Sequence, residues 1–222
     1  MKIPTVKLSV NASGAAVAAQ AGDVVVIVDV IDMSTTLEAA LDAGALAVFG
    51  AAPDSARPPV VTNPENIGLL AGKQAVDNNT GVVLVAEPRV GTDEERLQNI
   101  TRVTAGLARA AAEINAVLPN LGAETSKLCD LRGKVVIAAT ATGGVAFDAA
   151  VSGGAPAVFT GTVARTMQKK GPAPARSAAK RAVRAARALD AGITVVAASG
   201  NSMEDILAAE YITRTIIEEY LL

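Results

Sequence analysis

Runs of consecutive apolar residues recur along the chain, and each is followed by a polar turn and a segment with helical spacing. Four runs are nearly continuous in Val, Ile, Leu and Ala: residues 23–29, 81–87, 134–139 and 193–198. Such runs are typical of strands in a parallel sheet, because helices cover both faces of that sheet. Strands that alternate with helices predict an α/β protein with mainly parallel sheets and flanking helices.

The segments between these runs predict the remaining elements. Apolar residues spaced three and four apart predict helices at residues 33–43, 64–72, 145–152, 177–190 and 204–222. The same spacing predicts one long helix at 92–117. Short strands are expected at 47–50 and 157–160, and alternation over 2–11 favours an edge strand. Four prolines mark residues 53–64 as a loop.

Part of the sequence occurs twice. Residues 25–51 align without a gap to residues 135–161, and ten of the 27 positions are identical. The strand at 81–86 recurs at 192–197, so the order of segments is kept as well. We interpret the chain as two related halves, residues 1–120 and 121–222, that arose by internal duplication and pack as one unit. Eight strand residues should be buried in its core: Val26, Val28, Val83, Val85, Val136, Ile137, Val195 and Ala197.

Composition excludes several classes of function. The chain has no histidine and one cysteine, Cys129, which excludes Ser-His-Asp and Cys-His nucleophile systems and histidine metal sites. A net charge of −2 gives no general attraction to nucleic acid. No apolar run reaches the roughly 18 residues of a membrane span, and the first residues lack a signal peptide, so a cytoplasmic protein is expected. Carboxylates, hydroxyls, Lys, Arg, backbone amides and a hard metal ion remain for chemistry.

Four strand-to-helix junctions are candidates for a site, because ligands of parallel sheets bind beyond the carboxyl ends of the strands. They span residues 29–36, 87–95, 140–144 and 199–205. Three carry the capping-box pattern, at Thr35/Glu38, Thr92/Glu95 and Ser202/Asp205. Two interpretations stay open: well-capped helices, or free amides that face one cleft and attract an anion. The glycines at 143 and 144 favour close approach of a ligand to the backbone.

Acidic residues at these junctions suggest a metal site. A carboxylate that ends a Val/Ile strand, as Asp29 does, is costly unless it is paired, hydrogen-bonded or bound to a metal. With Asp32 and Glu87 it has the oxygen ligands that suit Mg²⁺. Alternatively, Asp29 caps a turn and Asp32 is solvated. Arg89 is expected to pair either with a phosphate or with Glu87.

These motifs resemble the 2-phosphosulfolactate phosphatases of coenzyme M biosynthesis, the ComB-like family. The segment Asp29-Val-Ile-Asp-Met-Ser-Thr-Thr36 is similar to the family's Asp-Val-x-Arg-Ala-Ser/Thr-Thr. The segments Gly133-Lys-Val-Val-Ile and Thr140-Ala-Thr-Gly143 are similar to its Gly-Lys-x-Val-x-x-Thr-Thr-Asn-Gly-Thr. The strand 193–198 and the following Ser-Met-Glu-Asp at 202–205 match its closing strand and helix. The resemblance implies two similar α/β halves and Mg²⁺-dependent release of phosphate from a small acidic substrate.

The sequence also departs from that family. Asp32 stands in place of an arginine, Thr142 in place of an asparagine, and residues 95–99 lack the family's Phe-Asp-x-Gly-Asn. Two hypotheses follow: a Mg²⁺-dependent phosphatase for a small phosphorylated acid, or a non-catalytic relative that binds an anionic ligand or a protein partner. For the phosphatase, the expected catalytic residues are Asp29 and Glu87, and the expected metal ligands are Asp29, Asp32 and Glu87. The expected substrate-binding residues are Ser34, Thr35, Arg89, Thr140, Thr142, Gly143, Gly144 and Asn201. The sequence leaves open whether the protein forms a homo-oligomer.

Overall fold

Two parallel sheets and the helices around them make up the computed structural model, which describes residues 5–220. The strands are β1 (Val6–Val10), β2 (Val24–Val28), β3 (Ala47–Ala51), β4 (Val82–Ala86), β5 (Ile114–Pro119), β6 (Val135–Ala139), β7 (Val158–Gly161) and β8 (Ile193–Ala197). The helices are α1 (Asn11–Gln20), α2 (Met33–Asp42), α3 (Pro64–Asp77), α4 (Asp93–Gln98), α5 (Thr101–Arg109), α6 (Gly143–Ser152), α7 (Ala173–Leu189) and α8 (Met203–Tyr220), with a 3₁₀ helix η1 (Gly122–Lys127).

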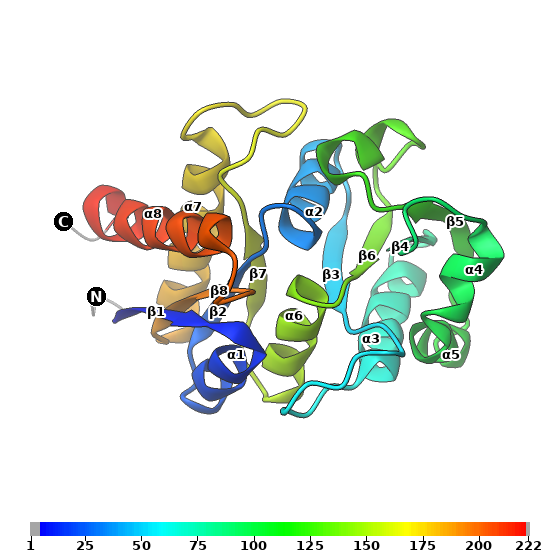
Figure 1. Cartoon of the computed structure of the whole chain (residues 1–222), viewed down its shortest axis with the longest axis horizontal. Helices are drawn as coiled ribbons and strands as arrows, with labels where there is room; N and C mark the ends of the chain where they lie inside the picture. The colour runs from blue at the N-terminus through cyan, green and yellow to red at the C-terminus, as the bar shows by residue number, and fades with distance from the viewer. Residues whose placement is uncertain (1–4, 221–222) are drawn as a thin grey trace.

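The elements form alternating layers of helix and sheet (Figure 1). Sheet A has the strand order β1-β8-β2-β7 and sheet B has the order β3-β6-β4-β5, with every pair parallel. Helices α2 and α6 lie between the sheets and contact strands of both. Helices α7 and α8 cover the outer face of sheet A, and α3 and α5 lie beyond sheet B. The predicted α/β class with parallel sheets and flanking helices is confirmed.

The strand orders of the two sheets correspond. If each strand of sheet A is replaced by its counterpart in the other half (β1 by β5, β8 by β4, β2 by β6 and β7 by β3), the order becomes β5-β4-β6-β3. This is the order of sheet B read from its other edge. The segments β2-α2-β3 and β6-α6-β7 also share the order strand, helix, strand. Each segment crosses from one sheet to the other, so each sheet takes strands from both halves of the sequence. This correspondence is consistent with internal duplication, which remains an interpretation.

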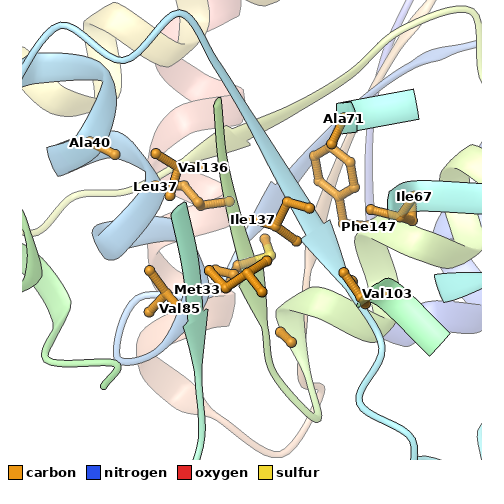
Figure 2. Close-up of a cluster of buried hydrophobic side chains, with 14 of the residues drawn as sticks. Met33, Leu37, Ala40, Ile67, Ala71, Val85, Val103, Val136, Ile137 and Phe147 are labelled. Atoms are coloured by element: carbon orange, nitrogen blue, oxygen red, sulfur yellow. The ribbon is translucent and has the colours of Figure 1, made fainter. Parts of the chain in front are cut away.

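Small aliphatic side chains fill the core. Val24, Val26 and Val28 of β2 pack toward α7 and α8, whereas Val25 and Ile27 face the layer between the sheets. Both faces of the strand are therefore buried, which is why its sequence is apolar without alternation. All eight predicted core residues are at most 1% exposed. Figure 2 shows the larger side chains of α2, α3 and α6 gathered around Val136 and Ile137 of β6.

The predicted long helix at 92–117 is wrong. It is divided into α4 and α5, and its last residues form β5, which pairs with β4. The first break comes where the Asp54 carboxylate accepts hydrogen bonds from the backbone N–H and hydroxyl of Thr101, which begins α5. The second comes at Ala111, where φ is +55° and the backbone cannot continue a right-handed helix.

Other local predictions also need correction. Helix α1 was not predicted, because its alanine-rich sequence lacks an apolar stripe. Thr35 lies inside α2 and does not cap it, and Glu38 accepts hydrogen bonds from Thr160 and Arg181 instead of from the helix start. Thr92 and Glu95 do form a capping box. Helix α3 is longer than expected, and part of the predicted edge strand at 2–11 falls outside the described residues.

No helix within residues 5–220 combines the length and the apolar character that crossing a membrane requires.

Candidate functional site

Three neighbouring strands of sheet B end side by side. Ala86, the last residue of β4, is in register with Ala139 of β6 and with Pro119 of β5. The residues that follow these strand ends are Glu87, Thr140 and Asn120. The carboxyl edge of sheet B therefore presents a carboxylate between a hydroxyl and an amide.

Asp29 joins this edge to sheet A. It follows β2, is 3% exposed, and accepts hydrogen bonds from the Thr142 hydroxyl at 2.8 Å and from the Gly143 N–H at 2.7 Å. The Asp32 N–H donates to its second oxygen at 3.1 Å. The carboxylate thus occupies the anion-binding start of α6. Burial raises the pKa of Asp29, against the lowering effect of Thr142 and with a further rise from the Asp32 charge.

The glycine at 143 is explained by this contact. A Cβ atom at that position would lie 2.3 Å from a carboxylate oxygen of Asp29. At position 144 a Cβ atom would lie 2.1 Å from the Ala51 carbonyl oxygen, and the Gly144 N–H donates to the Thr140 hydroxyl at 2.8 Å. Both amides proposed for ligand binding are therefore used within the chain, so a ligand there would have to displace Asp29 or Thr140.

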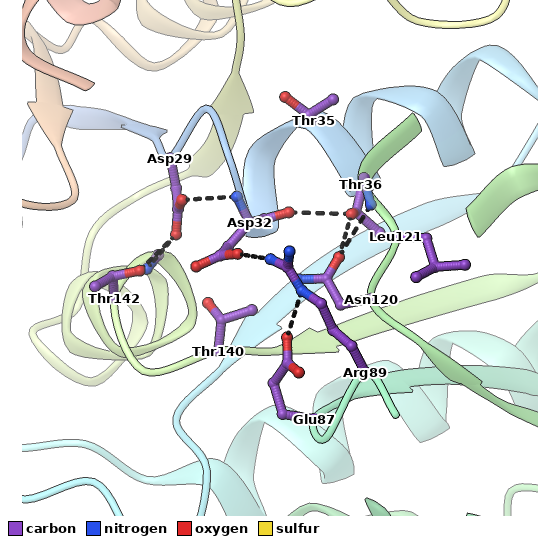
Figure 3. Close-up of polar contacts among 12 residues, drawn as sticks. Asp29, Asp32, Thr35, Thr36, Glu87, Arg89, Asn120, Leu121, Thr140 and Thr142 are labelled. Atoms are coloured by element: carbon purple, nitrogen blue, oxygen red, sulfur yellow. Dashed lines mark hydrogen bonds and ion pairs between the residues drawn. The ribbon is translucent and has the colours of Figure 1, made fainter. Parts of the chain in front are cut away.

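Arg89 bridges the other two acidic residues. Its guanidinium forms an ion pair with Asp32 and a longer one with Glu87, at 3.4 Å (Figure 3). All three side chains are accessible, with exposures of 47%, 35% and 43% for Arg89, Asp32 and Glu87. Of the two partners expected for Arg89, a phosphate and Glu87, the ion pair with Glu87 is present in the structure. Because one guanidinium already pairs with both carboxylates, a metal ion would have to compete with it.

The hydroxyls at the site have different partners. The Ser34 hydroxyl accepts from the Asp29 N–H at 3.0 Å and donates to the Ile27 carbonyl at 2.9 Å, so Ser34 is committed to the turn after β2. Thr35 bonds the Val30 carbonyl and Thr162, and in Figure 3 it points away from Arg89. The Thr140 hydroxyl accepts from Gly144 and so retains its own proton for another acceptor.

Asn120 is a residue that the sequence prediction missed. Its side chain is fully buried, and its carbonyl oxygen accepts from the Thr36 hydroxyl and, at 3.4 Å, from the Gly122 N–H. The Gly122 N–H can only donate, so this contact assigns the oxygen end of the amide. Its Nδ2 has no hydrogen-bond partner within residues 5–220. An unpaired buried donor is costly, which makes Asn120 a candidate for contact with an acceptor oxygen. The sequence signal for Asn120 is an asparagine that follows a strand, and it is hidden because the spacing of apolar residues predicts a helix where β5 lies.

The fourth junction reaches the site through a different residue from the one predicted. Asp205, in the first turn of α8, accepts a hydrogen bond from the Val30 N–H at 2.8 Å. Burial raises the pKa of Asp205 to about 6, and the nearby Asp29 charge contributes to the rise.

Asn201 is exposed, its N–H donates to the Ser199 hydroxyl at 3.2 Å, and its side chain has no hydrogen bond to the other candidate residues. One of the two hydrogen bonds of the predicted Ser202/Asp205 capping box is formed, from the Asp205 N–H to the Ser202 hydroxyl. The Asp205 carboxylate accepts from the Val30 N–H instead of from the Ser202 N–H.

Negative charge is in excess at this cluster. Asp29, Asp32 and Asp205 contact the turn after β2, and Arg89 pairs with Asp32 and with Glu87 from the end of β4. Within residues 5–220, no three Asp, Glu, Cys or His side chains form a group that could hold a metal ion. The carboxylates therefore do not form a metal cage made of protein ligands alone.

Neither the protein-family models nor the curated proteins searched contain a match to this sequence. The resemblance to the 2-phosphosulfolactate phosphatases therefore rests on the motifs quoted above.

Proposed function

We propose that the carboxyl-edge cluster is the active site of a Mg²⁺-dependent phosphatase for a small phosphorylated acid, such as 2-phosphosulfolactate. The observation that carries the proposal is the grouping of Glu87, Thr140 and Asn120 beside Arg89 at the strand ends, where parallel sheets bind ligands. The family resemblance motivates the choice of reaction and substrate. The proposal places the reaction in the cytoplasm, without a nucleic-acid partner.

The donor set fits Mg²⁺ in one particular way. Mg²⁺ is commonly bound by one or two carboxylates together with substrate phosphate and water, so a cage of three acids is not required. Asp32 and Glu87 have accessible oxygens and would hold the ion, whereas the oxygens of Asp29 are engaged by N–H and O–H donors. The bound ion would supply positive charge that offsets the charge of the phosphoryl group.

The chain's own residues have separable roles in this proposal. Arg89 and the Nδ2 of Asn120 bind phosphate oxygens, and the Thr140 hydroxyl donates to a third. Glu87, which is accessible and adjacent to Thr140 and Asn120, would hold the ion with one carboxylate oxygen and accept the proton of the attacking water with the other. The P–O bond to the substrate's alcohol oxygen breaks, and that oxygen takes a proton from solvent. Asp29 is a positioning residue, since its contacts hold the start of α6 and the Thr142 hydroxyl against the turn after β2.

The test is phosphate release from 2-phosphosulfolactate, phosphoglycolate and phospholactate, with and without Mg²⁺. We expect turnover that depends on Mg²⁺, and Glu87→Gln should lower kcat by about 100-fold or more, as loss of a general base does. Glu87→Gln removes only an exposed ion pair, so the fold should be kept. Asp130→Asn is the matched control, because Asp130 pairs with Arg132 on the surface near the start of β6, at the other end of the strand.

A folded wild-type protein that releases phosphate from none of these compounds would overturn the proposal. Full activity of Glu87→Gln would remove Glu87 from the general-base role.

One observation favours the alternative, a non-catalytic relative. The anion-binding groups are satisfied within the chain: Asp29 occupies the start of α6, and two carboxylates hold Arg89. In this case the cluster would bind a protein partner, or an anionic ligand that displaces these carboxylates, without turnover. Binding of inorganic phosphate by a protein that fails the turnover assay would support it.

A further inference from the structure

All three phenylalanines of the chain line one hollow. The protein has 222 residues and only 2% aromatic residues, yet Phe49, Phe147 and Phe159 border the same space of about 350 Å³. The rings of Phe49 and Phe147 meet edge to face, with centroids 6.4 Å apart and an interplanar angle of 67°. Aromatic side chains with a fixed geometry are typical of ligand pockets, and the volume lies within the range of small-molecule sites.

The hollow lies between the two sheets. Its apolar walls come from the first residues of the edge strands β3 and β7, from the last turn of α2 and from the middle and last turn of α6. Two pairs of equivalent repeat positions line it, Val48 with Val158 and Phe49 with Phe159. Because β3 and β7 line it with their first residues, the hollow is at the opposite end of the strands from the carboxyl-edge cluster.

The shape of the hollow favours a small molecule over a protein surface. Of the large apolar residues that line it, Leu46 is exposed, at 40%, whereas Phe147 is 2% exposed and the other two phenylalanines are partly buried. The apolar surface is therefore recessed. A flat protein surface would cover Leu46 but would not reach the rings.

Polar side chains also line the hollow. Arg181 of α7 lines it, is 28% exposed, and donates to Glu38, to the Thr160 carbonyl and to Ser177. The Nε of this guanidinium is buried without a hydrogen-bond partner within residues 5–220. Gln74 of α3 also lines the hollow, and no side-chain hydrogen bond of Gln74 is found in the described part of the chain. A cation and an amide thus border an otherwise apolar space.

We propose that this hollow, which we call the phenylalanine pocket, binds a small molecule with an aromatic-sized apolar body and one acidic group. The apolar body packs against Phe49, Phe147 and Phe159, and the acidic group lies toward Arg181. Burial of the body supplies the affinity. The acidic group accepts from the Nε–H of Arg181, whose terminal nitrogens already donate to Glu38, Thr160 and Ser177. The pocket is separate from the carboxyl-edge cluster and does not depend on phosphatase activity.

Naphthoate is a suitable probe, because the protein has no tryptophan and the fluorescence of the probe can be followed directly. We expect saturable binding of one naphthoate per chain. Ala155→Leu would fill the pocket from the loop before β7 and should weaken binding by about tenfold or more, which is about 1.4 kcal/mol. Ala45→Leu is the matched control, because Ala45 is the equivalent position of the first repeat and does not line the pocket. Naphthamide, which lacks the charge, should bind more weakly than naphthoate.

The outcomes separate the parts of the proposal. Absence of saturable binding, or equal affinity of wild type and Ala155→Leu, would overturn the pocket as a ligand site. Equal loss in Ala45→Leu and Ala155→Leu would show that the variants act through the fold and would also count against it. Equal affinity for naphthoate and naphthamide would overturn the assignment of an acidic ligand.

Discussion

Individual residues at the strand ends could be predicted only where a single residue breaks a strong pattern. Asp29 stands out because a carboxylate ends a Val/Ile strand, and the structure shows the hydrogen bonds that such a group requires. Asn120 could not be found in this way, since its significance depends on β5 pairing with β4 and on the Thr36 contact. Sequence alone also could not show that Asp29 itself occupies the start of α6.

Asn120 provides a test at this scale. Asn120→Asp keeps the oxygen that accepts from Thr36 but replaces the free N–H donor with an oxygen in a cluster that is already negative. We expect affinity for inorganic phosphate, measured by titration calorimetry, to fall by about tenfold or more. Asn11→Asp is the control, because Asn11 follows β1, the counterpart of β5, and its side chain accepts from the Gly200 N–H. Unchanged phosphate affinity in Asn120→Asp would remove Asn120 from the site.

At the scale of elements, the buried strands were predictable and the alanine-rich segments were not. Continuous Val/Ile runs can be buried in few ways, so β2, β4, β6 and β8 were found within a residue or two of their ends. Residues 92–117 have helical spacing throughout, but the Asp54 contacts and the turn at Ala111 divide them. The first break depends on Asp54, which is distant in the sequence, and the second depends on the backbone conformation of Ala111. For this reason the spacing of apolar residues did not reveal them.

Helix α8 offers a pH-dependent test, because Asp205 fixes its first turn to the backbone of Val30. Burial raises the pKa of Asp205 from 3.8 to about 6 in the folded protein. The folded state therefore binds the proton more tightly, and Asp205 makes the protein less stable as pH rises from about 4 through 6. Asp205→Asn keeps the acceptor oxygen and removes the charge.

We expect Asp205→Asn to increase the free energy of unfolding at pH 7.5, by at most about 3 kcal/mol, and to change it little at pH 4. Urea denaturation of both proteins at the two pH values measures this. If the two proteins are equally stable at pH 7.5, or if Asp205→Asn is the less stable one there, burial of the Asp205 carboxylate does not destabilise the folded protein.

At the scale of the whole molecule, the correspondence of strand orders makes the two halves interdependent. The sequence repeat indicated two related halves but gave no sign that β3 and β7 cross between the sheets, because sheet membership depends on pairing between distant strands. Each half alone would leave strands of both sheets without their partners, which exposes apolar edges and faces.

Separate expression of residues 1–112 and 113–222, divided at the turn before β5, tests this interdependence. We expect neither fragment to show a cooperative thermal transition alone, and a mixture of the two to recover one. Circular dichroism of the fragments and of the mixture measures it. Cooperative unfolding of one isolated fragment would contradict the interdependence of the halves.

The central claim is that a divalent cation and phosphate meet at the carboxyl-edge cluster. Mn²⁺ takes the same oxygen ligands as Mg²⁺ and broadens the NMR signals of nearby nuclei, so the most direct measurement is Mn²⁺ titration of ¹⁵N-labelled protein with inorganic phosphate present. The account predicts that the backbone amide signals of residues 29–33, 87, 89–90 and 140–144 broaden first and recover when Mg²⁺ is added in excess. Broadening centred on any other part of the chain, or none at these three turns, would contradict it.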